Sequence, residues 1–145
     1  MRGDRHPGDV GLTYVRVRLS KGPSGPARPV RVLVDTGATY TMLPRSLLEA
    51  LRIEPAWTER VRLADGRLVE WGLGEAYVRY GKYATHTWVL FGEPESPSVL
   101  GALTLEELRL QVDPRSRRLR KIKVAVMASA EGRSAGTIAG SNPAL

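Results

Sequence analysis

Asp35 is the residue of this sequence whose position best suits chemistry. It follows the apolar, valine-rich run Val30–Val34 and leads directly into Thr36 and Gly37. Such a run between turn signals is typical of a buried strand. Because an unpaired buried carboxylate is costly, we expect the loop to hold Asp35 through the Thr36 hydroxyl and through backbone N–H groups near Gly37. A carboxylate held in this way can accept or deliver a proton.

A simpler interpretation is that Asp35 only shapes the turn after the strand, since Asp, Thr and Gly are common turn residues. The residues on both sides favour the functional interpretation. An apolar run precedes the turn, and a second short extended run, Tyr40–Leu43, follows it and ends at Pro44. We therefore treat the Asp35 carboxylate as the candidate catalytic group.

Two short motifs resemble those of the retropepsin-like aspartic proteases, particularly the small single-lobed bacterial kind. The catalytic motif of that family is matched by Asp35, Thr36, Gly37 and Ala38. The second signature, two hydrophobic residues and a glycine on the strand beneath the active-site loop, is matched by Val99, Leu100 and Gly101. The resemblance covers roughly residues 10–124. It implies a mostly β fold, a single-lobed acid-protease β-barrel with two short helices.

The resemblance also implies hydrolysis of peptide bonds by two carboxylates around one water molecule. One carboxylate takes a proton from the water, while the other is protonated and polarises the scissile carbonyl. The chain has one Asp-Thr-Gly, and no comparable context surrounds its other aspartates, Asp4, Asp9, Asp65 and Asp113. The second carboxylate must then come from a second copy, so we expect a symmetric homodimer with one Asp35 per chain. In that dimer the resemblance implies that Thr36 braces the loop across the two-fold axis.

One feature departs from the retroviral members of the family, in which arginine and a polar residue follow the second glycine. Here Ala102 and Leu103 follow Gly101, so we expect different dimer contacts and the same chemistry. The alternative interpretation is a non-catalytic dimeric module that binds peptides with the same fold. The sequence has no Cys and only two His, 80 residues apart at His6 and His86. We therefore expect no metal site and no cofactor.

Hydrophobic periodicity predicts the elements that position the first motif. Residues 10–20 alternate between apolar and polar side chains, which indicates a half-buried strand. A loop rich in Pro and Gly, residues 21–29, then joins this strand to the one before Asp35, making a hairpin. Pro44 suits the first turn of a helix, and the helix that we expect from Pro44 to about Arg52 has an apolar face formed by Leu47, Leu48 and Leu51.

A second hairpin is predicted around Asp65-Gly66, because Asp-Gly between extended runs is a strong hairpin signal. The flanking runs are residues 61–63 and 68–71. The resemblance places the flap here, the hairpin that closes over bound peptide. It implies a substrate-binding tip formed by Ala64, Asp65, Gly66 and Arg67, with Asp65 as a turn former and not a catalyst.

Longer strands are predicted at residues 73–80 and 84–91, joined at Gly81-Lys82. Thr104 and Glu107 have the spacing of a capping box at the start of a second helix. Residues 48–54 and 105–111 resemble each other 57 positions apart, which indicates two related halves within one lobe. Closing strands are predicted at residues 110–114 and 119–126.

The length of 145 residues suits one domain. We expect a flexible N-terminal tail at residues 1–9, the protease domain at 10–126 and a disordered C-terminal tail, rich in Ala, Ser, Gly and Thr, at 127–145. The sequence has neither an apolar leader nor a membrane-spanning segment. We therefore expect a cytoplasmic protein without a membrane partner.

The net charge of +7 is concentrated near the C-terminus. Residues 1–114 carry 15 Lys and Arg against 14 Asp and Glu, whereas residues 115–145 carry 7 against 1. Such a cluster can contact nucleic acid or an acidic partner. Because no aromatic residues that could stack on bases are interleaved in segment 115–123, we favour a solvated final strand there. Binding of RNA or DNA through residues 115–123 stays the alternative interpretation.

Overall fold

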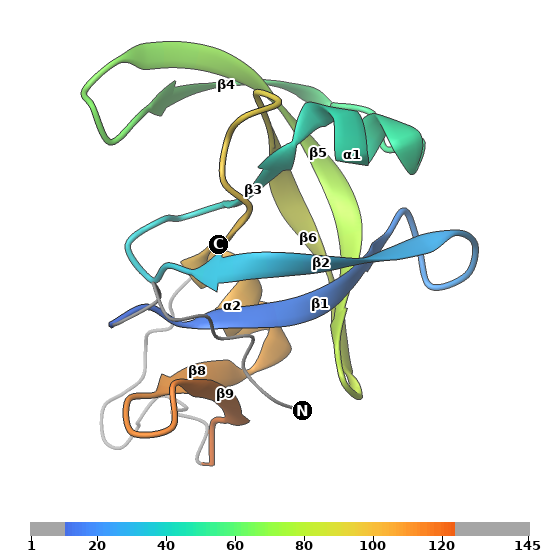
Figure 1. The fold of residues 1–145 in the computed structure, drawn as a ribbon. Helices are drawn as coiled ribbons and strands as arrows, with labels where there is room; N and C mark the ends of the chain where they lie inside the picture. The colour runs from blue at the N-terminus through green and yellow to red at the C-terminus, as the bar shows by residue number, and fades with distance from the viewer. Residues whose placement is uncertain (1–10, 124–145) are drawn as a thin grey trace, which may run out of the picture.

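The computed structural model describes residues 11–123. The tails that we expected at residues 1–9 and 127–145 lie outside the described residues. Within residues 11–123 the chain forms a mostly β lobe with two short helices, so the predicted fold class is confirmed. No helix in this part of the chain is long and apolar enough to cross a membrane. Figure 1 shows how the elements are arranged.

The described elements are nine strands and two helices. The strands are β1 (Tyr14–Ser20), β2 (Ala27–Val34), β3 (Thr41–Pro44), β4 (Trp57–Arg62), β5 (Leu68–Tyr80), β6 (Tyr83–Gly92), β7 (Val99–Leu100), β8 (Leu110–Asp113) and β9 (Arg118–Lys121). The helices are α1 (Arg45–Ala50) and α2 (Ala102–Leu108).

Seven strands form one sheet that closes on itself. Their order is β1-β2-β7-β3-β6-β5-β4, and a further antiparallel pairing of β1 with β5 completes the closure. The alternation predicted for β1 is confirmed, because Val15, Val17 and Leu19 are buried and Arg16 and Arg18 are exposed. The hairpin of β4 and β5 extends from the closed part as an arm (Figure 1).

The separate extended runs predicted at residues 68–71 and 73–80 are one strand, because β5 runs without interruption for 13 residues. The glycines of this strand allow residues 54 and 55 to pack closely against it, and they do not form a turn. A Cβ atom added at Gly72 would lie 2.8 Å from Cβ of Pro55, and one added at Gly74 would lie 2.6 Å from the carbonyl oxygen of Glu54. Glycine in a strand commonly marks such an approach.

The two similar segments 57 positions apart, residues 48–54 and 105–111, have the same local structure. Arg52 and Arg109, which occupy the same place in the two copies, follow the two helices, and both adopt the left-handed conformation with φ of 63°. The hydrophobic positions of the repeat are buried in both copies, at Leu48, Leu51 and Ile53 and at Leu105, Leu108 and Leu110. Each copy thus packs one face of a short helix and the residue after its left-handed turn into the same core.

The closing strands are shorter than predicted and form a separate sheet. β8 and β9 pair with each other, with Leu110 opposite Lys121 and Asp113 opposite Arg118. The turn between them ends β8 at Asp113, where Asp113 accepts a hydrogen bond from the Arg115 N–H and Arg117 has a φ of 58°. Residues 124–126 of the predicted second strand lie outside the described part.

Candidate active site

Asp35 lies where β2 ends above β7. The two strands are parallel, with Leu33 beside Val99 and Val34 beside Leu100. The Asp35 N–H donates to the Leu100 carbonyl over 3.0 Å. The structure therefore brings the two predicted motifs together, with Val99, Leu100 and Gly101 directly beneath the Asp35 loop.

The loop holds the carboxylate partly as expected. The Gly37 N–H donates to Asp35 Oδ1 over 2.9 Å, and the Ala38 N–H donates to the Asp35 carbonyl over 3.1 Å. A Cβ atom at Gly37 would lie 3.2 Å from the same Oδ1, so glycine allows this approach. Within the described residues no hydrogen bond of the Thr36 hydroxyl is found, and this side chain is exposed. Its expected bracing role involves a second chain and stays a prediction.

The expectation of a fully buried strand before Asp35 is wrong for the single chain. Of the run Val30–Val34 only Val32 is buried, and the Asp35 side chain is exposed. Within residues 11–123 the Asp35 carboxylate is thus in contact with solvent.

The loop after Asp35 is clamped to the start of α2. The Ala102 N–H donates to the Ala38 carbonyl over 2.7 Å, and the Leu103 N–H donates to the Thr39 carbonyl over 3.1 Å. Gly101 packs so closely that an added Cβ would lie 2.5 Å from the backbone of Tyr40. The glycine of the second motif thus permits the contact that joins it to the first motif.

A network of three buried threonine hydroxyls lies behind this contact. Thr104 Oγ1 is 2.6 Å from Thr41 Oγ1 and 2.8 Å from Thr87 Oγ1, and the Gly101 N–H donates to Thr41 Oγ1 over 3.1 Å. The predicted capping box is wrong. Gly101 occupies the N-cap position of α2 without a side-chain cap, and Thr104 lies inside the helix with its hydroxyl directed to the network.

Glu107 lies at the outer end of this network. Burial raises the pKa of its carboxyl group, and a hydrogen bond from Thr87 lowers that pKa to a smaller extent. Since Gly101 donates to Thr41, the hydroxyls can each donate in turn through Thr104 and Thr87 toward Glu107. Every buried hydroxyl then has both a donor and an acceptor.

A groove of about 550 Å³ separates the Asp35 loop from the arm of β4 and β5. Asp35, Gly37 and Ala38 line it on one side. The rest of its lining is mainly apolar and includes Leu33, Met42, Leu90 and Val99 from the closed sheet and Val61, Leu63 and Ala64 from the arm. Such a groove suits an extended chain with apolar side chains next to the acid.

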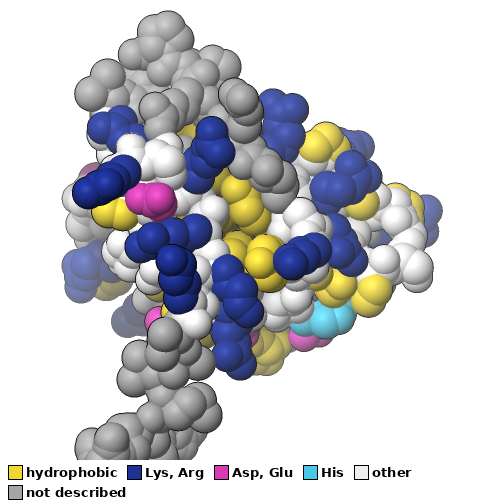
Figure 2. Space-filling view, turned by 90° about the horizontal axis from the view of Figure 1, so that it is seen from below, with side chains coloured by type: hydrophobic (Ala, Val, Ile, Leu, Met, Phe, Trp, Pro, Cys, Tyr) yellow, Lys and Arg dark blue, Asp and Glu magenta, His cyan; other side chains and the backbone are white. Residues whose placement is uncertain are grey.

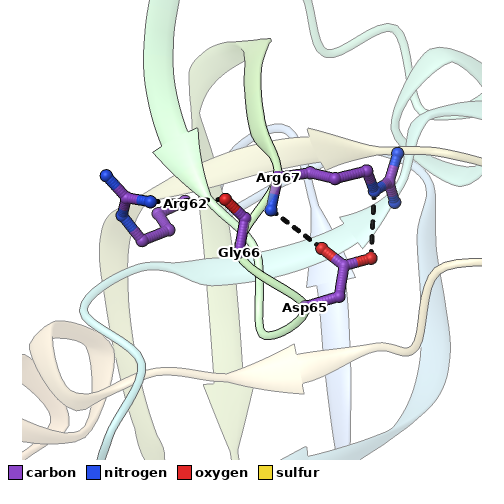
Figure 3. A network of polar contacts seen from close by, with 4 residues as sticks. All are labelled: Arg62, Asp65, Gly66 and Arg67. Atoms are coloured by element: carbon purple, nitrogen blue, oxygen red, sulfur yellow. Dashed lines mark hydrogen bonds and ion pairs between the residues drawn. The ribbon is translucent and has the colours of Figure 1, made fainter.

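The tip of the arm is a tight turn held by its own side chains (Figure 3). Asp65 accepts hydrogen bonds of 3.0 Å from both the backbone N–H and Nε of Arg67, and these bonds lower the pKa of its carboxyl group. Arg62 donates to the Gly66 carbonyl over 3.3 Å. Gly66 has a φ of 93°, a conformation that favours glycine. Asp65 is thus a turn former, as predicted, and of the four tip residues Ala64 lines the groove.

Sequence reasoning missed Tyr40 as a residue of the site. Tyr40 lines the groove, and its hydroxyl lies 3.4 Å from Glu59 Oε2 on β4. Burial raises the pKa of the Tyr40 hydroxyl, and the neighbouring Glu59 carboxylate raises it further. No sequence pattern marks this pair, because its members are 19 residues apart on different elements.

Comparisons with known proteins agree with this geometry. The model of the aspartyl protease family matches residues 15–104. The EIAV protease, solved with the inhibitor HBY-793, is similar in structure, with 18% identity, a TM-score of 0.56, and coverage of 72% of this chain and 94% of that one. A retropepsin-like aspartic protease from Rickettsia conorii has 20% identity, a TM-score of 0.55, and coverage of 75% and 80%.

A search of curated proteins found no match. The family match spans more than half of the chain and includes the Asp35 loop, and the similar structures share its single-lobed β fold. The chain belongs to the aspartyl protease family, and its fold is that of the retropepsin-like proteins.

Proposed function

We propose that the protein is a homodimeric aspartic endopeptidase in which each chain contributes Asp35 to one shared catalytic centre. The observation that carries this proposal is the exposed Asp35 carboxylate, held by the Gly37 N–H and facing a groove large enough for a peptide. Family membership supports peptide hydrolysis. The chain has one Asp-Thr-Gly, so the two carboxylates of the reaction require two chains.

The chemistry follows from placing two carboxylates around one water molecule. At a separation of about 3 Å and an effective dielectric constant of about 20, two ionised carboxylates repel by about 5 kcal/mol. The pair therefore holds one proton between its members. The ionised Asp35 takes a proton from the water, and the protonated Asp35 of the other chain polarises the peptide carbonyl.

The substrate is an extended peptide lying in the groove. The apolar lining favours peptides with apolar side chains next to the bond that is cut. The arm of β4 and β5 acts as the flap, which closes over the peptide and excludes water. Thr36 braces the two Asp35 loops across the dimer axis, and Ala38 supports the loop from below through its bond with Ala102. A cytoplasmic location and the domain limits at residues 10 and 126 stay predictions.

Cleavage of a peptide library by purified protein tests the proposal. We expect Asp35→Asn to reduce cleavage by several orders of magnitude, and Asp113→Asn, which keeps the acceptor oxygen in its turn, to leave cleavage unchanged. Unaltered cleavage by Asp35→Asn would exclude this residue as the catalyst. Sedimentation across a dilution series should show a dimer at concentrations where the protein is active. Peptide binding to that dimer without cleavage would indicate the non-catalytic module instead.

A further inference from the structure

The end of the molecule opposite to the flap carries a dense group of cations. We call residues 110–123 the basic hairpin, because they comprise β8, β9 and the segment that follows. This hairpin contains one acid, Asp113, and six cations, Arg115, Arg117, Arg118, Arg120, Lys121 and Lys123. Figure 2 shows this face, on which Lys and Arg side chains outnumber Asp and Glu. The β8–β9 end and the arm of β4 lie at opposite ends in Figure 1.

The basic hairpin is fixed to the body of the protein. Leu110 and Leu119 belong to the hydrophobic core. The Tyr80 hydroxyl interacts with the Leu119 backbone through a hydrogen bond, and the Ile122 N–H donates to the Arg109 carbonyl over 3.0 Å. Its cations are therefore presented from an ordered surface, with Arg118 and Arg120 exposed on either side of the buried Leu119.

An aromatic ring from another part of the chain lies beside these cations. A hollow of about 250 Å³ separates the turn between β5 and β6 from β9, and Tyr83, Arg120 and Lys121 line it. Tyr83 is half-buried, and Nζ of Lys82 lies 5.5 Å from the centre of its ring. The aromatic neighbour that segment 115–123 lacks in sequence is thus supplied by the fold.

We propose that this surface binds single-stranded nucleic acid, with phosphates on Arg120, Lys121 and Lys82 and one base against the ring of Tyr83. Cations that follow a backbone, combined with an aromatic face, are the general means of binding single strands without sequence preference. The hollow is smaller than the roughly 300–1,000 Å³ of small-molecule sites, so it suits one planar base.

Two other anionic partners fit these observations less well. A membrane surface calls for apolar side chains among the cations, and the large exposed hydrophobic residues of the described chain, Leu12, Trp57 and Leu68, lie outside the basic hairpin. An acidic protein segment would use the cations and leave the ring of Tyr83 without a role. The proposal does not depend on proteolysis, because the surface lies away from the groove.

The test uses the full chain and a short fluorescein-labelled oligothymidylate, with binding followed by fluorescence anisotropy at several salt concentrations. For the double variant Arg120→Gln/Lys121→Gln we expect weaker binding and a salt slope smaller by about 1.4, since each phosphate contact contributes about 0.7 for single strands. The control Lys21→Gln/Arg45→Gln removes two exposed cations elsewhere and should retain the original slope.

A second variant tests the role of the ring. Tyr83→Leu keeps an apolar side chain against the core and removes the stacking face, so oligothymidylate should bind roughly 5- to 150-fold more weakly. Heparin, a polyanion without bases, should bind this variant as it binds the original protein. A melting curve checks that both proteins are folded at the assay temperature.

Three results would overturn the proposal. The first is the absence of oligothymidylate binding at low salt. The second is an equal loss of binding in the control double variant. The third is polyglutamate binding as tightly as the oligonucleotide, with Tyr83→Leu affecting neither, because this would assign the surface to an acidic protein.

Discussion

The Oγ1 atoms of Thr41 and Thr104 lie 2.6 Å apart in the core, although the two residues are 63 positions apart in sequence. Thr41 begins the strand that follows the Asp35 loop, and Thr104 lies in the helix that follows the second motif. Their contact therefore joins the elements that follow the two motifs, in addition to the hydrogen bond from the Ala102 N–H to the Ala38 carbonyl. The predictions below test how much the site depends on this arrangement.

Thr104→Val should destabilise the protein by about 1–3 kcal/mol, because it leaves the buried hydroxyls of Thr41 and Thr87 without their shared partner. Thr104→Ser keeps the hydroxyl and should cost less. Urea denaturation of both variants measures the difference in the free energy of unfolding. Equal stability of the valine and serine variants would show that the hydroxyl of Thr104 contributes nothing.

Gly101→Ala should lower the free energy of unfolding by about 1–3 kcal/mol, because the added Cβ would lie 2.5 Å from the Tyr40 backbone. A backbone atom cannot move aside as the end of a flexible side chain can. The matched control is Gly22→Ala, where an added Cβ meets no atom within 4 Å. Thermal unfolding of the two variants provides the comparison. We expect Gly101→Ala also to reduce peptide cleavage, since the added Cβ would displace the backbone of Tyr40, which belongs to the loop after Asp35.

Arg109→Gly should stabilise the protein by about 1 kcal/mol, because a non-glycine residue with a φ of 63° carries a conformational cost that glycine avoids. Arg52→Gly should behave in the same way, since the two residues occupy equivalent positions of the repeat. Arg45→Gly, at the start of α1, should instead destabilise by about 0.5–1 kcal/mol. A destabilising effect at both left-handed positions would mean that the arginine side chains make compensating contacts.

The pH dependence of stability should change in Glu107→Gln. Burial raises the folded-state pKa of Glu107 above its ordinary value of 4.5. The contribution of Glu107 to the free energy of unfolding is therefore fully present below pH 4.5, where the carboxyl group is protonated. It is lost as the pH rises through the raised pKa. The glutamine variant should gain stability relative to the original protein at neutral pH and lose that advantage in acid. Denaturation at several pH values measures this, with Glu49→Gln on α1, outside the threonine network, as the control.

Short-range patterns predicted most of the elements of the fold. The alternation in β1, the Asp65-Gly66 turn and the repeat of Leu48 and Leu105 each depend on residues close in sequence, and the structure contains all three. The continuity of β5 was not predicted. Gly72 is needed because Pro55 packs against it, and a sequence pattern does not reveal this contact between different parts of the chain.

The parts of the site that sequence reasoning missed depend on longer separations. Thr87 and Thr104 are 17 residues apart and Tyr40 and Glu59 are 19 apart, and neither pair has a motif that marks it. The spacing of Thr104 and Glu107 indicated a capping box, but the Thr104 hydroxyl bonds to Thr41 in the buried network instead. The exposure of Asp35 was missed for a different reason, since an apolar run does not reveal which of its faces remains uncovered.

That exposure has a consequence for how activity would be controlled in a cell. If catalysis requires two copies, as proposed, an isolated chain supplies one solvent-exposed carboxylate of the two and would not cleave other proteins. Under the proposed function, the rate at low abundance would rise with the square of the amount of chain synthesised. Expression level would then set a threshold below which little peptide is cleaved.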